Sequence, residues 1–363
     1  MEKPTSDMRT ALRRAGAALA SAVLMVATTA TAALAKPHVA IVATGGTIAG
    51  AQTSPQGPGY TAGAFNIETL IAGVPQLKDI ADISGEQLVK IGSQDMNDAV
   101  WLKLAKRVNE LLAGKDVDAV VITHGTDTMD ETSYFLDLVV NSDKPVVLVG
   151  SMRPATAISA DGPGNLYDAV TVAADPDAKG RGVLVVLNDQ VFAARDVYKT
   201  NTTQVDTFRA PDRGPIGRVE DGSATLFEMP TGKHTTTSGF SVAGADALPK
   251  VDIVYAYANM GRELIDAAVN AGAKGIVVAG VGNGNMTAEA LQALSDARKK
   301  GVVVVRSTRL PSGAVTRNAE VNDDELGFVA AEELKPGKAR VLLKLALMKT
   351  SDPAQIQQMF REY

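Results

Sequence analysis

The sequence predicts an α/β protein with two domains: a larger N-terminal parallel-rich sheet flanked by helices, and a smaller C-terminal parallel-sheet domain. A chain of 363 residues exceeds the usual size of a single domain. Apolar runs of strand length alternate with segments of helical periodicity. Uninterrupted runs of Val, Ile and Leu are typical of parallel strands that are buried on both faces.

The N-terminal part repeats the order strand, polar turn, helix. The predicted strands are residues 38–44, 118–123, 145–150 and 182–188. Trp101 and the leucines after it fit the apolar face of a helix that packs in the core, and residues 166–174 are also helical in pattern. Ligands of parallel sheets bind beyond the carboxyl ends of the strands. The polar turns after the first three strands should therefore converge on one crevice if those strands are neighbours.

Hydrophobic periodicity lapses around residues 220–250, where turn residues predominate. We interpret this stretch as a linker with some short strands. The pattern then predicts strands at 251–259, 275–285 and 302–309 and helices at 262–272, 287–301 and 353–363. The predicted organisation is a signal peptide 1–35, an N-terminal domain 36–225, a linker 226–249 and a C-terminal domain 250–363.

The first 35 residues have the pattern of a secretory signal. Four basic residues precede an apolar, Ala-rich stretch, which ends in the A-x-A cleavage pattern Ala33-Leu34-Ala35. An uncleaved membrane anchor is the alternative, and the cleavage pattern argues against it. Cleavage would leave Lys36 first and export the chain to the periplasm. No second long apolar run follows, so the mature chain is expected to be soluble and free of the membrane.

Charge and residue usage exclude several classes of protein. The chain has a formal net charge of −5, and loss of four basic and two acidic residues with the signal leaves −7. Such an acidic chain lacks the basic footprint of a nucleic-acid-binding protein. The absence of cysteine excludes disulfides and a thiol nucleophile, so core burial and subunit association must supply stability. No zinc, nucleophile-elbow or phosphate-loop motif occurs, and neither a metal nor a cofactor is expected.

The turn after the first strand, GGTIAG at 45–50, places a hydroxyl beside two glycines. A dinucleotide fingerprint would need glycine where Thr47 stands. The glycines allow backbone amides to approach a small ligand, and the helix start that follows favours an anion. Thr47 is therefore well placed to attack a carbonyl whose oxyanion those amides receive. The alternative is a threonine that only caps the helix.

The turn after the second strand places Thr126 and Asp127 behind Gly125. Helix capping alone would also explain a threonine beside an aspartate at this position. Two such turns at the same edge of the sheet favour a pair of reacting hydroxyls.

These motifs resemble those of the asparaginase/glutaminase family, in particular the bacterial type II (periplasmic) L-asparaginases. The matching stretches occur in the family's order and cover essentially the whole mature chain. They are ATGGTIAG (43–50), GSQDMND (92–98), VITHGTDTMDET (121–132), GSMRPATAISADGPGNLYDAV (150–170), RDVYKTNTT (195–203) and GVGNGN (280–285).

The resemblance implies hydrolysis of L-asparagine to L-aspartate and ammonia through a threonine acyl-enzyme, with slower hydrolysis of L-glutamine. It makes Thr47 the attacking hydroxyl, with Tyr60 as its partner. It groups Thr126, Asp127 and Lys199 as a second triad. Burial would favour a neutral Lys199 amine, and the Asp127 carboxylate opposes this. Unless burial dominates, we expect the Lys199 ammonium to stay charged, to orient Thr126 and to stabilise developing negative charge.

The resemblance also implies the residues that bind the substrate. Ser93 and Gln94 would hold its α-carboxylate and α-amino groups, with help from Asp127. A homotetramer is implied, in which Asn285 and Glu320 complete a neighbouring subunit's site. Glutaminase-active members tend to carry Glu and Ser where this chain has Gln94 and Asn285, so asparagine should be preferred.

Two further predictions concern loops near the site. Tyr60 lies in the Gly- and Pro-rich segment 54–65, which we expect to close over the substrate as a lid. His124 is expected to brace its loop rather than to transfer protons.

The main alternative is a periplasmic amino-acid-binding protein without catalysis, which would need no paired threonine hydroxyls. A nucleotide-dependent oxidoreductase is disfavoured by the failed fingerprint. A relative that modifies charged tRNA inside the cell is disfavoured by the signal segment and the acidic charge.

Overall fold

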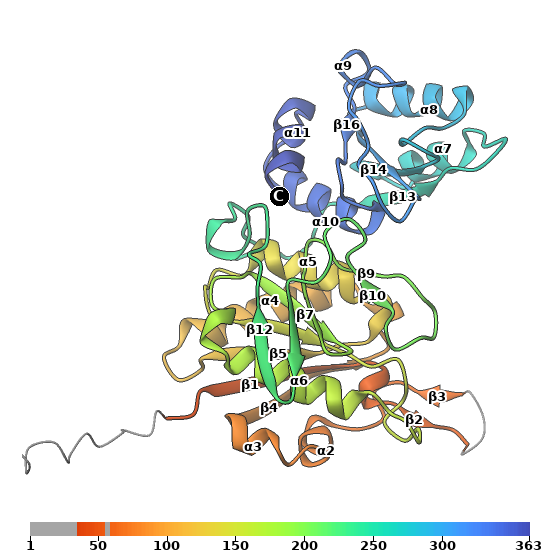
Figure 1. The fold of residues 1–363 in the computed structure, drawn as a ribbon. Helices are drawn as coiled ribbons and strands as arrows, with labels where there is room; N and C mark the ends of the chain where they lie inside the picture. Colours follow the sequence, from red (N-terminus) through yellow and green to blue (C-terminus); the bar gives the residue numbers. More distant parts are fainter. Residues whose placement is uncertain (1–34, 55–58) are drawn as a thin grey trace, which may run out of the picture. The chain divides into compact units, whose positions relative to one another are not determined.

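The computed structural model describes residues 35–54 and 59–363. The predicted signal lies outside the described residues except for its last residue, Ala35. Pro37–Tyr363 forms one compact unit, which contains an eight-stranded sheet and a separate four-stranded sheet (Figure 1). The predicted α/β fold with a larger and a smaller parallel sheet is confirmed. In the described part of the chain, no helix has both the length and the hydrophobicity needed to cross a bilayer.

The large sheet has the strand order β12-β11-β8-β7-β6-β5-β1-β4. Its strands are β1 (His38–Gly45), β4 (Asp82–Ile91), β5 (Ala119–Thr123), β6 (Val146–Val149), β7 (Val183–Leu187), β8 (Gln190–Ala193), β11 (Gly217–Glu220) and β12 (Ser223–Leu226). From β7 to β4 neighbouring strands are parallel, whereas β8, β11 and β12 join in antiparallel pairs. β5 and β7 are buried along their whole length, as their Val-rich sequences predict.

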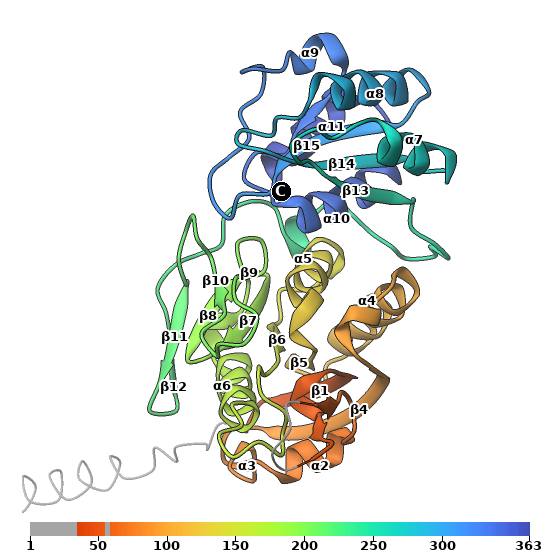
Figure 2. The same ribbon diagram turned by 90° about the vertical axis from the view of Figure 1, so that its right-hand side faces the viewer.

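Helices cover both faces of the large sheet, as Figure 2 shows. Helices α4 (Asp98–Ala113) and α5 (Met129–Val139) pack on one face, and α2 (Ile67–Ala72), α3 (Leu77–Ile80) and α6 (Gly162–Ala174) pack on the other. Trp101 is buried as predicted: its ring stacks on Phe135 at 5.1 Å between centroids, and its indole N–H donates to Thr132 at 2.9 Å.

The order of the strands brings the polar turns together. β1 pairs in parallel with β4 on one side and with β5 on the other, and β5 pairs in parallel with β6. Because parallel strands end at the same edge of a sheet, the turns after β4, β1, β5 and β6 lie side by side. This edge is where the sequence predicts the crevice.

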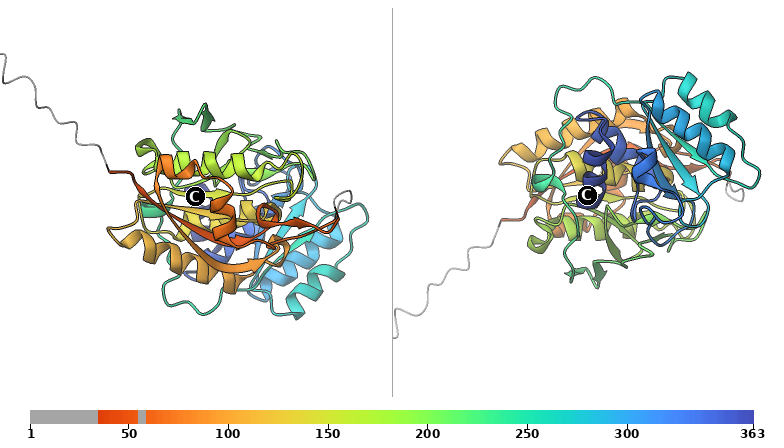
Figure 3. Two further views of the ribbon diagram at one scale, coloured as in Figure 1. Left: turned by 90° about the horizontal axis from the view of Figure 1, so that it is seen from below. Right: turned by 90° about the horizontal axis from the view of Figure 1, so that it is seen from above.

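The smaller sheet is parallel, with the order β13-β14-β15-β16. Its strands are β13 (Val251–Tyr255), β14 (Gly275–Gly280), β15 (Val303–Thr308) and β16 (Val329–Ala330). Helices α7 (Glu263–Asn270) and α8 (Ala288–Lys299) cover one face, and α10 (Pro336–Leu347) and α11 (Pro353–Glu362) cover the other (Figure 3). Helix α10 also packs against α5, so leucines of α10 share one hydrophobic core with both sheets.

Five further elements are short, and two of them carry the predicted site residues Tyr60 and Lys199. They are β2 (Ala51–Gln52), β3 (Tyr60–Thr61), β9 (Tyr198–Lys199), β10 (Phe208–Arg209) and the short helix α9 (Asp323–Leu326). The predicted linker 226–249 contains the last residue of β12, Leu226, and a 3-10 turn, Thr235–Thr237. The predicted domain boundaries at 225 and 250 stay a prediction.

Candidate active site

Three turns meet at the site because two glycines have no side chains. Gly46 has φ 80°, and a Cβ on it would come within 2.3 Å of the Gly125 nitrogen. A Cβ on Gly125 would come within 2.5 Å of the Ser93 hydroxyl oxygen. Only glycine lets these backbones pack so closely. Thr47, Ser93 and Thr126 therefore lie on three adjoining turns.

Thr47 contacts Tyr60, as predicted. It begins a single 3-10 turn (Thr47–Ala49) after β1 and is 7% exposed. Its Oγ1 lies 2.9 Å from the Tyr60 hydroxyl. Tyr60 stands on β3, which pairs with β2 in a two-stranded ribbon. Residues 55–58, between these two strands in the sequence, lie outside the described residues. Tyr60 therefore contacts Thr47 in this structure, and closure of segment 54–65 over a substrate stays a prediction.

Thr126, Asp127 and Lys199 form a second cluster. Thr126 is buried in the 3-10 turn that leads into α5. The Lys199 ammonium, reaching over from β9, donates to Thr126 Oγ1 at 2.9 Å and to Asp127 Oδ1 at 2.6 Å. The Lys199 side chain is 18% exposed, whereas that of Asp127 is 56% exposed. An ion pair this exposed adds little stability.

Ser93 and Gln94 differ in how firmly they are held. Ser93 is 5% exposed, and its hydroxyl accepts a hydrogen bond from the Asp127 amide at 3.1 Å. The Thr128 hydroxyl donates to the Ser93 carbonyl at 2.8 Å. Gln94 is exposed, and its side-chain amide lies against Gly92. Ser93 is thus locked to the second cluster, while Gln94 borders it.

Asn285 and Glu320 lie beyond the strands of the smaller sheet. Asn285 Nδ2 donates to Glu320 Oε2 at 2.7 Å. The buried ion pair of Arg306 and Asp323, 2.6 Å apart, supports both loops, because Arg306 also donates to the carbonyls of Gly284 and Thr316. Among the described residues, Asn285 and Glu320 form no hydrogen bond to the Thr47 or Thr126 clusters.

His124 is fully buried beside Thr126. Its Nδ1 lies 2.6 Å from the Gly125 carbonyl oxygen, which assigns the proton to Nδ1 as donor. Burial lowers the pKa of His124 to about 4, against the weaker effect of this hydrogen bond. The imidazole is therefore neutral near pH 7, which fits a residue that braces the turn.

His124 should make the protein sensitive to acid. The unfolded chain binds a proton at His124 near pH 6.5 and the folded chain only near pH 4, so stability is lost as pH falls through this window. His124→Asn, which keeps a donor for Gly125, should lose about 2 kcal/mol less stability than the unchanged protein between pH 7 and pH 5. Urea unfolding at the two pH values measures this difference.

Asp137 and Asp168 act in the opposite direction. Burial raises the pKa of each to about 7, so they add stability as pH falls. Both carboxyls are present in the two proteins and cancel in the comparison. If the free energy of unfolding changes equally with pH in the variant and in the unchanged protein, His124 does not cause the acid sensitivity.

Asp130, whose carboxyl interacts electrostatically with Lys199, was not among the residues that the sequence predicted for the site. Burial raises its pKa, while the positive charges of Lys338 and Lys199 lower it. It lies in the first turn of α5, one helical turn after Asp127. A second acidic residue at this spacing was the available signal, but helix capping explains such a residue equally well.

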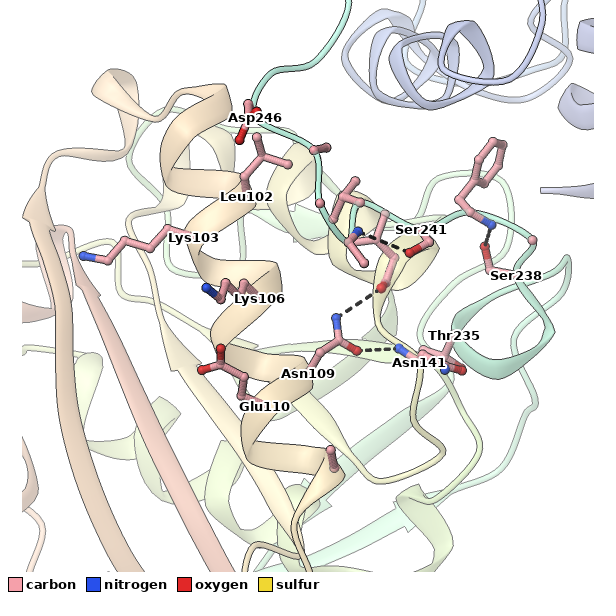
Figure 4. Close-up of a pocket in the computed structure, with 18 residues that line it drawn as sticks. Leu102, Lys103, Lys106, Asn109, Glu110, Asn141, Thr235, Ser238, Ser241 and Asp246 are labelled. Carbon is pink, nitrogen blue, oxygen red and sulfur yellow. Dashed lines mark hydrogen bonds between the residues drawn. The ribbon is translucent and has the colours of Figure 1, made fainter.

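A cavity of about 1040 Å³ lies elsewhere, between α4 and residues 235–246 (Figure 4). On its α4 side, Asn109 donates to the Val139 carbonyl at 3.2 Å and accepts from the Asn141 amide at 2.8 Å. None of its lining residues is a predicted site residue. Converging turns, and not cavity size, therefore identify the candidate active site.

Family comparisons match most of the chain. The family model "Asparaginase, N-terminal" matches residues 38–231, and "Glutaminase/Asparaginase C-terminal domain" matches residues 250–360. The chain belongs to the asparaginase/glutaminase family. The resemblance inferred from the motifs is confirmed.

Several individual proteins are similar over most of their length. "Probable L-asparaginase periplasmic" of Haemophilus influenzae is 57% identical over 327 residues, covering 90% of this chain and 93% of the relative. "L-asparaginase 2" of Escherichia coli is 55% identical, with 92% and 95% covered. "Glutaminase-asparaginase" of Pseudomonas fluorescens biotype A is 48% identical, with 90% of each covered.

A solved structure has the same fold. The crystal structure of a probable cytoplasmic L-asparaginase from Campylobacter jejuni matches with a TM-score of 0.88 and 50% identity, covering 90% of this chain and 100% of that chain. The comparisons give no support to the alternative of an amino-acid-binding protein.

Proposed function

We propose that this chain hydrolyses L-asparagine to L-aspartate and ammonia through an acyl-enzyme on Thr47, with L-glutamine as a slower substrate. As a member of this family the chain is an amidohydrolase, and its relatives are named L-asparaginases and glutaminase-asparaginases. We choose Thr47 as the nucleophile because its hydroxyl lies 2.9 Å from that of Tyr60, beside the turn formed by Gly45 and Gly46.

The first half-reaction forms the acyl-enzyme. Thr47 Oγ1 attacks the side-chain amide carbon of asparagine, and its proton leaves through the Tyr60 hydroxyl. Backbone amides of the turn stabilise the oxyanion. The C–N bond breaks, and the nitrogen takes up a proton and leaves as ammonia. Water then attacks the ester, which releases aspartate and restores the Thr47 hydroxyl.

The second cluster supports both steps and binds the substrate. Lys199 orients Thr126, which relays protons and supports the developing negative charge. Asp127 gives one carboxylate oxygen to Lys199, and the other can accept a hydrogen bond from the substrate's α-ammonium group. Ser93 and Gln94 hold the substrate's α-carboxylate and α-amino groups, and Asp127 helps them.

Asparagine should be the better substrate. A difference of one methylene is worth about 1–3 kcal/mol, so kcat/KM should favour asparagine over glutamine by roughly 10- to 200-fold. Steady-state ammonia release on both substrates measures the ratio, and hydroxylamine traps the acyl-enzyme as a hydroxamate. In the Gln94→Glu variant, the ratio of kcat/KM for asparagine to kcat/KM for glutamine should be smaller. Equal kcat/KM for the two substrates in the unchanged protein would contradict the proposal.

Location and assembly are part of the proposal. Cleavage after Ala35 would deliver a periplasmic protein, and one relative is named periplasmic while the matching solved structure is named cytoplasmic. We infer a homotetramer in which Asn285 and Glu320 complete the site of a neighbouring subunit. Ile253, Tyr255 and Leu310 are large apolar residues that are at least 40% exposed, which supports association of subunits. Cell fractionation with N-terminal mass analysis tests the first point, and light scattering tests the second.

A further inference from the structure

Lys338 is a fully buried lysine that contacts the segment leading to Lys199. It lies in α10 and is 0% exposed. Its Nζ donates to the Val197 carbonyl and, at 2.9 Å, to the Arg195 carbonyl. Nζ also lies 3.9 Å from the centre of the Tyr198 ring. These three contacts fall on the four residues before Lys199.

The strand that carries Lys199 needs such support. β9 consists of Tyr198 and Lys199 and pairs with the equally short β10. A ribbon of this length is marginal alone, so contacts with the rest of the protein must fix its position. From this ribbon the Lys199 ammonium must reach Thr126 at 2.9 Å and Asp127 at 2.6 Å.

Stability alone is a weak reason for a buried ammonium. Removing a charge from water is costly, and an apolar residue of similar volume often gives an equally stable protein. Burial lowers the pKa of Lys338 to about 7, opposed chiefly by the carboxylates of Asp130 and Asp196 and reinforced by Arg195. The geometry gives the amino group a different task, because its N–H donors are directed at the backbone beside Lys199.

We propose that Lys338 is a positioning residue for the Thr126–Lys199 pair, fixing the backbone at 195–198 so that Lys199 reaches Thr126 and Asp127. The proposal rests on the proposed role of Lys199 in catalysis. Lys338 touches no reacting atom. Its effect is transmitted through main-chain position, and a displacement of about 1 Å at a catalytic group can cost about a hundredfold in rate.

Lys338→Met tests the proposal, because methionine keeps the length of the stem and removes the ammonium. We expect kcat for asparagine to fall by about 10- to 100-fold. KM should change by a smaller factor than kcat, since Ser93 is held independently of α10. Lys344→Met is the matched control. Lys344 is a buried lysine on the same helix, 3% exposed, and its hydrogen bond goes to Asp98 of α4 at 2.7 Å, so its replacement should leave kcat within about twofold.

A double variant separates positioning from general damage. If Lys338 acts through Lys199, Lys338→Met should cost no further kcat in a Lys199→Met background. An undiminished loss in that background would overturn the proposal, as would a single variant that keeps kcat within about twofold. If Lys338→Met fails to fold, Lys338→Gln, which keeps one donor, is tested in the same way, and failure of both to fold would assign Lys338 to stability alone.

The same set of proteins distinguishes failure of this inference from failure of the proposed function. If Lys199→Met loses kcat and Lys338→Met does not, only the positioning role is wrong. If Lys199→Met keeps full kcat, the proposed role of Lys199 is wrong and the positioning role falls with it.

Discussion

Thr47→Ala is expected to lower kcat for asparagine by roughly 10⁴- to 10⁶-fold, the largest effect of any substitution considered for this chain. The variant removes the only atom that forms the ester, and the residual rate reflects binding and oxyanion stabilisation. Thr47 is buried in a turn that backbone contacts of Gly46 define, so the methyl-sized residue should leave the fold intact.

Thr44→Val is the matched control for Thr47→Ala. Thr44 stands three residues earlier, is 2% exposed, and donates its hydroxyl to the Thr123 carbonyl at 2.9 Å. Its loss should cost about 1 kcal/mol of stability with little change in kcat. Steady-state ammonia release gives the rates, and mass analysis of peptides from acid-quenched enzyme locates the acyl group. An acyl group on Thr126, or a Thr47→Ala variant within tenfold of full activity, would reassign the nucleophile.

The central strands could be predicted because both of their faces are buried. The predicted strands 118–123 and 145–150 correspond to β5 and β6 with ends that differ by at most one residue. The edge strand β4 was not predicted, because its residues are only partly buried and its place depends on pairing with β1, more than 40 residues earlier in the chain. The hydrophobic pattern of a strand reflects how far its residues are buried, and the residues of this edge strand are buried only in part.

Helix α10, which carries Lys338, was not predicted either. Lys338 and Lys344 interrupt its apolar pattern, although both are buried in the structure. A lysine in a sequence normally marks an exposed face. Here the Lys338 amino group donates hydrogen bonds to backbone carbonyls, and the Lys344 amino group donates to Asp98. These partners lie far away in the sequence, so no local pattern reveals them.

The site was predictable to the extent that its chemistry is local. Thr47 and Thr126 could be found because each follows glycine at a strand end. Lys199 and Tyr60 were predicted only from the family resemblance. Each lies on a two-stranded ribbon outside the two main sheets, and no local sequence pattern shows that such a ribbon reaches the threonines. The pairing of Asn285 with Glu320 likewise depends on two loops that the buried Arg306 joins.

Lys199→Met should give the second largest effect, a loss of about 10²- to 10⁴-fold in kcat. Methionine matches the lysine stem in length but gives Thr126 no donor and leaves Asp127 without its cation. Because the Asp127 side chain is 56% exposed, water can solvate the unpaired carboxylate, and the urea midpoint should change little. Stopped-flow or coupled measurement of ammonia release at saturating asparagine gives kcat directly.

A comparison with Thr126→Val decides whether Lys199 acts through Thr126. Valine matches the shape of threonine without the hydroxyl, and groups that act as a unit show strongly non-additive losses. The double variant Lys199→Met, Thr126→Val should therefore be only slightly slower than the slower single variant. If the two losses instead multiply, Lys199 acts on the substrate or through Asp127 rather than through Thr126. In that case the 2.9 Å hydrogen bond to Thr126 is not the route by which the ammonium affects the rate.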